Sequence, residues 1–169
     1  MCGLAVAALV VLSFARLARE HRPDPKWRAA REIARIALTT NGVLHSALRT
    51  PHSTFLLVGD WDPEFVYLSL LLPDSSLLCL PDLALDLNRD YSRFLATLEQ
   101  RIAETQVRQG RVFVVNVLNR SPGQLEPLYV RRLGFARFLS QLAELSQQSR
   151  LVWSDPQTGA TLSELPTSE

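Results

Sequence analysis

Short apolar runs alternate along this chain with segments in which apolar residues recur at helical spacing. The apolar runs predict strands over 54–58, 77–80, 111–118 and 150–153. Helical spacing predicts helices over 24–41, 63–71, 90–109 and 125–148, and the apolar stripe of the first can continue to Arg49. Strands that alternate with helices imply parallel β-α-β crossovers. We therefore expect an α/β fold: a Rossmann-like three-layer sandwich of about four mostly parallel strands.

The segments between these elements predict turns and loops. Pro73–Ser76 is typical of a turn, and 82–88 predicts a loop or short turn. The stretch 119–123 predicts a loop between the third strand and the last helix. Residues 155–159 predict a turn that leads into a polar tail, so no strand is expected after it.

The first 22 residues differ from the rest of the chain. Cys2 to Ala15 is almost uninterrupted apolar sequence, and Arg16, Arg19 and Arg22 follow it. Three interpretations compete: a signal peptide, the remaining half of a transmembrane helix, and a core helix. A signal peptide carries its positive charges before the apolar stretch, and a core helix shows a polar face, whereas only Ser13 is polar here.

The transmembrane interpretation fits this pattern best, although the apolar stretch is shorter than the roughly 20 residues that span a bilayer. We therefore expect the protein to extend upstream. The predicted division is a partial transmembrane helix with a basic juxtamembrane segment over 1–22, preceding a soluble α/β domain over 23–165.

Charge and cysteine content exclude several classes of protein. The 169 residues carry a formal net charge of +1, so the basic surface of a nucleic-acid-binding protein is missing. Cys2 and Cys79 lie far apart in unlike settings, which makes a disulfide improbable, and two cysteines are too few for a typical zinc site. Cys79 lies in an apolar run and is typical of a small buried hydrophobe.

The end of the first predicted strand carries the candidate site. Gly59 is followed by Asp60, Trp61 and Asp62, and Pro63 begins the next helix. Ligands of open α/β sheets bind in the crevice beyond the carboxyl ends of the strands. Asp62 is explained by helix capping, since its carboxylate can accept from first-turn N–H groups. Asp60 adds like charge beside that cap rather than stability, so a role in binding a metal or sugar hydroxyls is kept as an alternative to a purely structural one.

A second candidate follows the third predicted strand. If the strands are parallel, Asn116, Asn119 and Arg120 lie at the same edge of the sheet as Asp60. The predicted ligand-binding residues are thus Asp60, Trp61, Asp62 and Asn119. A Trp ring could stack on a sugar face while carboxylates accept hydrogen bonds from its hydroxyls.

Signatures of catalysis and of cofactor binding are missing from the sequence. A single Gly59 does not make the Gly-x-Gly-x-x-Gly pattern of dinucleotide binding, so NAD and FAD are disfavoured. No Gly-x-Ser-x-Gly elbow occurs, and the three histidines do not cluster with a nucleophile. We assign no catalytic residue, cofactor or resident metal.

The segment Val58–Tyr67, followed by an apolar strand ten residues later, resembles part of a known family. It is similar to the soluble C-terminal region of bacterial multi-spanning glycosyltransferases of the protein mannosyltransferase-like, lipid-phosphate-sugar-dependent class. The resemblance implies an α/β domain on the extracytoplasmic (periplasmic) side, following a last membrane span. The chain departs from the family in having Ser69-Leu-Leu-Leu where a charged residue is expected. Nothing in it corresponds to the family's catalytic acids, which lie in early loops between membrane spans.

Two functional hypotheses follow. In the first, the chain is a non-catalytic extracytoplasmic domain of a membrane glycosyltransferase-like protein, packed on upstream spans and in contact with glycan, lipid-linked sugar or acceptor. In the second, it is a free-standing, membrane-anchored Rossmann-like domain that binds a small ligand or nucleotide at the strand ends. The arginines at 16, 19 and 22 favour a cytoplasmic domain under the positive-inside rule, whereas the resemblance implies the opposite side.

Overall fold

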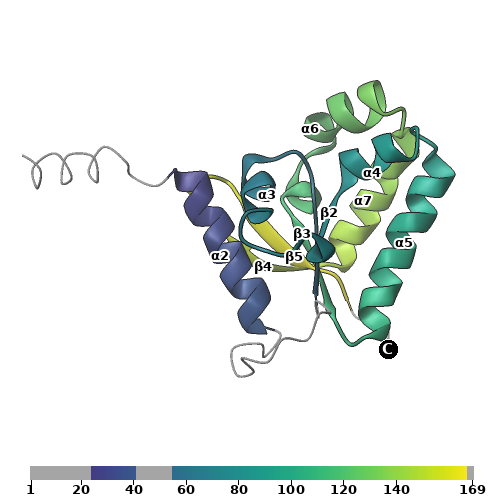
Figure 1. The fold of residues 1–169 in the computed structure, drawn as a ribbon. Coiled ribbons are helices and arrows are strands. Elements are labelled where there is room, and N and C mark those ends of the chain that lie inside the picture. The colour runs from purple at the N-terminus through teal and green to yellow at the C-terminus, as the bar shows by residue number, and fades with distance from the viewer. Residues whose placement is uncertain (1–23, 41–54, 167–169) are drawn as a thin grey trace, which may run out of the picture.

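One five-stranded mixed sheet forms the centre of the molecule (Figure 1), which a computed structural model describes over residues 24–40 and 55–166. The strands are β1 (Phe55–Gly59), β2 (Leu77–Cys79), β3 (Arg111–Val115), β4 (Arg150–Ser154) and β5 (Thr161–Glu164). They lie in the order β2-β1-β3-β5-β4. β1 pairs in parallel with β2 and β3, whereas β5 runs antiparallel to both β3 and β4.

Helices cover both faces of this sheet, as Figure 1 shows. On one face lie α2 (Pro25–Thr40) and α3 (Pro63–Leu68). The other face is covered by α4 (Leu80–Asp86), α5 (Tyr91–Val107), η3 (Val117–Asn119), α6 (Pro122–Glu126), the π-helix η4 (Pro127–Arg132) and α7 (Ala136–Gln148). A 3-10 turn, η2 (Asp74–Ser76), precedes β2. The predicted α/β class is confirmed.

The two apolar cores follow from side-chain alternation along β1 and β3. Leu56, Val58, Val112 and Val114 face the α5–α7 side. Phe55, Leu57, Phe113 and Val115 face α2 and α3. Because both faces of these strands are buried, β1 and β3 read as continuous apolar runs rather than as alternating ones.

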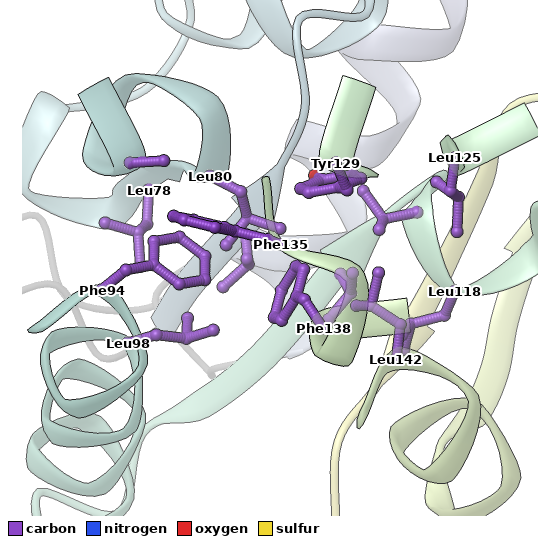
Figure 2. Packing of buried hydrophobic residues seen from close by; sticks show 14 of the residues in the cluster. Leu78, Leu80, Phe94, Leu98, Leu118, Leu125, Tyr129, Phe135, Phe138 and Leu142 are labelled. Carbon is purple, nitrogen blue, oxygen red and sulfur yellow. The ribbon is translucent and has the colours of Figure 1, made fainter. Parts of the chain in front are cut away.

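Aromatic rings fill the larger core (Figure 2). Phe94 of α5 packs against Phe135 and Phe138 at ring-centroid distances of 4.9 and 5.0 Å. Tyr129 of η4 lies 5.2 Å from Phe138 and is fully buried. These contacts pack η4 and α7 against each other, and the Tyr129 hydroxyl lies 3.5 Å from Asp60 Oδ2, just after β1.

Two segments that were predicted to be loop or tail are regular elements. The predicted loop at 82–88 is largely α4, because Pro81 occupies the first turn of a helix, where no N–H is required, and Ala84 is buried. The predicted polar tail contains β5, which lies between β3 and β4. The sheet therefore has five strands instead of about four, and two of its four pairings are antiparallel.

The predicted long helix over 125–148 is also wrong as a single element. It begins earlier, at Pro122, and is interrupted between η4 and α7. Gly134 has a φ of 81°, which ends a right-handed helix, and Phe135 N donates to Tyr129 O across the break at 2.6 Å. With the helix interrupted here, Tyr129 and Phe135 both pack into the larger core.

The predicted transmembrane segment over 1–22 lies outside the described residues. Within 24–40 and 55–166, no helix is long and apolar enough to cross a membrane.

Candidate functional site

The connections that follow β1 and β3 leave the sheet toward opposite faces. After β1 the chain enters α3 on one face, and after β3 it enters η3 and α6 on the other. Because β1 and β3 are adjacent and parallel, their carboxyl ends form a topological switch point. This is the position at which open α/β sheets bind ligands.

Asp62 does not cap α3 in the expected way. It occupies the N-cap position, but its side chain accepts no hydrogen bond from the first turn. Its Oδ2 accepts from Asn116 Nδ2 at 3.1 Å, and its Oδ1 accepts from Arg120 Nη2. The capping interpretation is therefore wrong, since the Asp62 carboxylate joins the ends of β1 and β3 instead.

Arg120 serves two carboxylates. Besides its bond to Asp62, its Nη1 lies 3.5 Å from Asp60 Oδ2. The Tyr129 hydroxyl lies 3.5 Å from the same Asp60 oxygen, and Trp61 N donates to Asp60 Oδ1 at 2.6 Å. Asp60 is only 3% exposed, so these contacts are what stabilise a carboxylate removed from water.

The start of β5 is bonded to the segment after β3. Asn116, with a φ of 61°, accepts at Oδ1 from Thr161 N at 2.8 Å and donates from its own N to Thr161 O at 3.0 Å. Asn119 Nδ2 donates to Thr161 Oγ1 at 3.1 Å and to Ser163 Oγ at 2.9 Å. The β4–β5 turn is thereby fixed as one wall of the switch point.

A polar cleft of about 330 Å³ opens at this switch point. The polar side chains that line it include Asp62, Glu64, Asn116, Asn119, Arg120 and Gln124, and the β4–β5 turn contributes residues 158–161. Lys26, an exposed residue of α2, lies at its rim. We call this the switch-point cleft.

Asp60 and Trp61 line a different cavity. It has about 300 Å³ and is bounded also by Phe65, Cys79 and Asp82. Trp61 Nε1 donates to Asp82 Oδ1 at 2.7 Å, and the Arg132 guanidinium lies 4.6 Å from the Trp61 ring centre. Of the four predicted site residues, the structure thus places Asp62 and Asn119 in the switch-point cleft and Asp60 and Trp61 beside it.

Burial dominates the electrostatics of the second cavity. It raises the pKa of Asp60, the charge of Asp62 raises it further, and the backbone bond from Trp61 and the charge of Arg120 oppose the shift. Burial also raises the pKa of Tyr129 well above its usual value and that of Cys79 to about 12. A thiol with that pKa is not a nucleophile at neutral pH.

The metal role considered for Asp60 gains no support. In the part of the chain that the structure describes, no three His, Cys, Asp or Glu side chains are grouped to hold an ion. Both Asp60 oxygens already accept from Trp61, Arg120 or Tyr129. Its role in binding sugar hydroxyls stays a prediction.

Three contributors to the site were not predicted from the sequence. Arg120 was placed at the correct edge of the sheet but was not selected as a site residue, and its pairing with Asp60 and Asp62 spans 60 and 58 positions. Glu64 was not selected as a candidate site residue. The turn at 155–159 was predicted, but the segment after it was assigned to a tail, and no local pattern shows that this segment returns to β3 as β5.

Comparison with protein-family models, with curated proteins and with solved structures finds no match to this chain.

Proposed function

We propose that this chain is a non-catalytic glycan-binding domain, and that its ligand is a hydroxylated small molecule or sugar residue held in the switch-point cleft. One observation carries this proposal: the cleft lies at the topological switch point and is lined by interspersed hydrogen-bond donors and acceptors. Asn119 and Gln124 offer amides, Asp62 and Glu64 offer carboxylates, and Arg120 offers a guanidinium. A polyol presents matching donors and acceptors on each hydroxyl.

Two features support binding without catalysis. Asp60, the carboxyl with the raised pKa, lies outside the residues that line the switch-point cleft. Asp62, which does line it, is already engaged by Arg120 and Asn116. General acid–base catalysis needs a group within hydrogen-bond reach of the reacting atoms. Asp60 does not line the cleft and Asp62 is not free of partners, so neither of these two acids is assigned a catalytic role.

The parent protein is proposed from the resemblance described above. We infer a membrane glycosyltransferase-like protein whose catalytic acids lie upstream of this chain, with the domain on the extracytoplasmic side. In that setting the cleft would contact the glycan, the lipid-linked sugar or the acceptor. Upstream membrane spans in the same reading frame would support this assignment.

The second hypothesis, a free-standing domain that binds a small ligand or nucleotide, shares the same cleft. A nucleotide is disfavoured because Asp62 and Glu64 would repel its phosphates, while Arg120 is engaged by Asp60 and Asp62 and Lys26 lies exposed at the rim. The glycine that ends β1 is not followed by a second one in the loop, so no phosphate-cradling loop is formed there.

The experiment is isothermal titration of the full chain, in mild detergent, against a panel of free hexoses, hexosamines, N-acetylhexosamines and nucleotides. The expected result is saturable binding of at least one sugar that Asn119→Ala weakens and that Gln100→Ala, on the exposed side of α5, leaves unchanged. Binding of nucleotides alone would favour the second hypothesis, and no binding at all would overturn the proposal.

A further inference from the structure

Glu64 is a buried carboxylate without a partner. It is 4% exposed, lies in the first turn of α3 and lines the switch-point cleft. Over 24–40 and 55–166 its side chain makes no hydrogen bond or ion pair with any residue, in contrast to Asp60 and Asp62. No fully buried side-chain oxygen or nitrogen of the described ranges lacks a partner, so the Glu64 oxygens open onto the cleft.

The cations near the cleft do not neutralise Glu64. Arg120 is the cation that pairs with Asp60 and Asp62, and both of its contacts go to these two acids. Lys26 lies at the rim, where its side chain is exposed to water. Arg120 is therefore engaged by Asp60 and Asp62, and no cation of the described residues lies within ion-pairing distance of Glu64.

A buried carboxylate is stabilised most by a charged donor. Hydrogen bonds in which donor or acceptor is ionised are roughly twice as strong as those between neutral groups. The N-terminal dipole of α3 favours a negative charge at this position but leaves the carboxylate oxygens free to accept. The missing partner is therefore best supplied by a ligand that brings its own positive charge.

Resting on the proposed function, we infer that Glu64 binds the ammonium group of the ligand, so that the switch-point cleft selects hydroxylated ligands with a primary amine, such as amino sugars. The ammonium donates to Glu64, while the ligand hydroxyls contact Asn119 and Gln124. Neutral sugars lack the charged donor, and N-acetylation removes the charge and adds bulk. The negative phosphate of a sugar phosphate is repelled by the Glu64 carboxylate.

The test is titration of the full chain with three matched sets: glucosamine, galactosamine and mannosamine, each with its parent hexose and its N-acetyl derivative. Measurements at about pH 6 keep the sugar amines protonated. At least one hexosamine is expected to bind about tenfold or more tightly than its hexose and its N-acetyl derivative. Glu64→Gln should abolish that preference and leave hexose affinity within about twofold, whereas Glu99→Gln on exposed α5 should change neither.

Salt dependence of the wild-type protein gives a second readout that needs no variant. The preference for the hexosamine should decrease as salt is added, since an ion pair is screened, while hexose affinity stays constant. Equal affinity for hexosamine and hexose would overturn the inference and leave the proposed function standing. A preference that survives in a folded Glu64→Gln variant would also overturn it, and failure of every sugar to bind would overturn both.

Discussion

Arg120 of the segment after β3 donates a hydrogen bond to Asp62, which lies 58 positions earlier in the chain and follows β1. The ion pair joins two connections that leave the sheet toward opposite faces. The same guanidinium reaches Asp60 at 3.5 Å. One cation thus joins the segments after two strands and lines the switch-point cleft.

Replacement of Arg120 by Met should destabilise the protein. The change leaves Asp60, at 3% exposure, and Asp62 without their cation. Removing one partner of a buried pair costs about 3–5 kcal/mol, and because the Arg120 side chain is 29% exposed we expect about 2–3 kcal/mol in urea unfolding. Arg131→Met, which breaks an exposed pair with Glu126, is the control and should cost less than about 0.5 kcal/mol. Equal effects of the two changes would contradict this account of Arg120.

Gly59 is required by the close approach of Phe65. A Cβ at position 59 would lie 2.1 Å from Phe65 Cδ2 and 2.7 Å from its Cγ, so the ring would have to move. Gly59→Ala should therefore lower the free energy of unfolding by about 1–3 kcal/mol. Gly123→Ala meets no atom within 4 Å and lies in α6, so it should be neutral or slightly stabilising. Thermal unfolding of the two variants and the wild type measures the difference. A Gly59→Ala variant as stable as the wild type would refute the packing argument.

Because the pKa of Asp60 is raised, the free energy of unfolding should depend on pH. Between the ordinary value of 3.8 and the higher folded pKa, the folded state binds more protons than the unfolded state. The free energy of unfolding of the wild type therefore falls as pH rises through this window. Asp60→Asn has no such titration, so its stability relative to wild type should increase from about pH 4 upward, as measured by urea unfolding at a series of pH values.

Glu164 should show the opposite behaviour. Burial alone would raise its pKa, but hydrogen bonds from Arg111 and Arg150 lower it below the ordinary 4.5. Its contribution to stability is therefore present above that value and is lost as pH falls through the folded pKa. Glu164→Gln should be destabilising at neutral pH and converge on the wild type in acid. The same sign of pH dependence for Asp60→Asn and Glu164→Gln would contradict one of the two assignments, and the sign observed would show which one.

Trp61 should not contribute to binding in the switch-point cleft. Its ring is stacked by Arg132, its Nε1 is bonded to Asp82, and it lines the neighbouring cavity. Trp61→Phe should leave sugar affinity within about twofold, whereas Asn119→Ala should reduce it by about tenfold, as the loss of one or two hydrogen bonds would. A larger loss in Trp61→Phe would restore the expectation of a sugar stacked on its indole.

The parallel part of the sheet was predictable because β1 and β3 are buried on both faces and are therefore continuously apolar. β5 was not, since Ser163 is a buried polar residue whose hydroxyl is satisfied by Asn119, a partner 44 positions away. Local sequence likewise predicted Asp62 as a helix cap. Its carboxylate instead accepts from the guanidinium of Arg120, which is distant in sequence and a stronger donor than the N–H groups of the first helical turn. The acids at the end of β1 could be located from sequence, whereas their partners depend on tertiary contacts.

The most direct test of the central claim is amide chemical-shift mapping of the full chain during titration with glucosamine and glucose. Binding at the switch point predicts that the largest shifts fall on residues 116–120 and 158–161, with smaller changes in α5. Shifts concentrated around Trp61 and Cys79, or between α5 and α7, would contradict the assignment of the cleft. No shift with either sugar at saturating concentration would contradict the glycan-binding function itself.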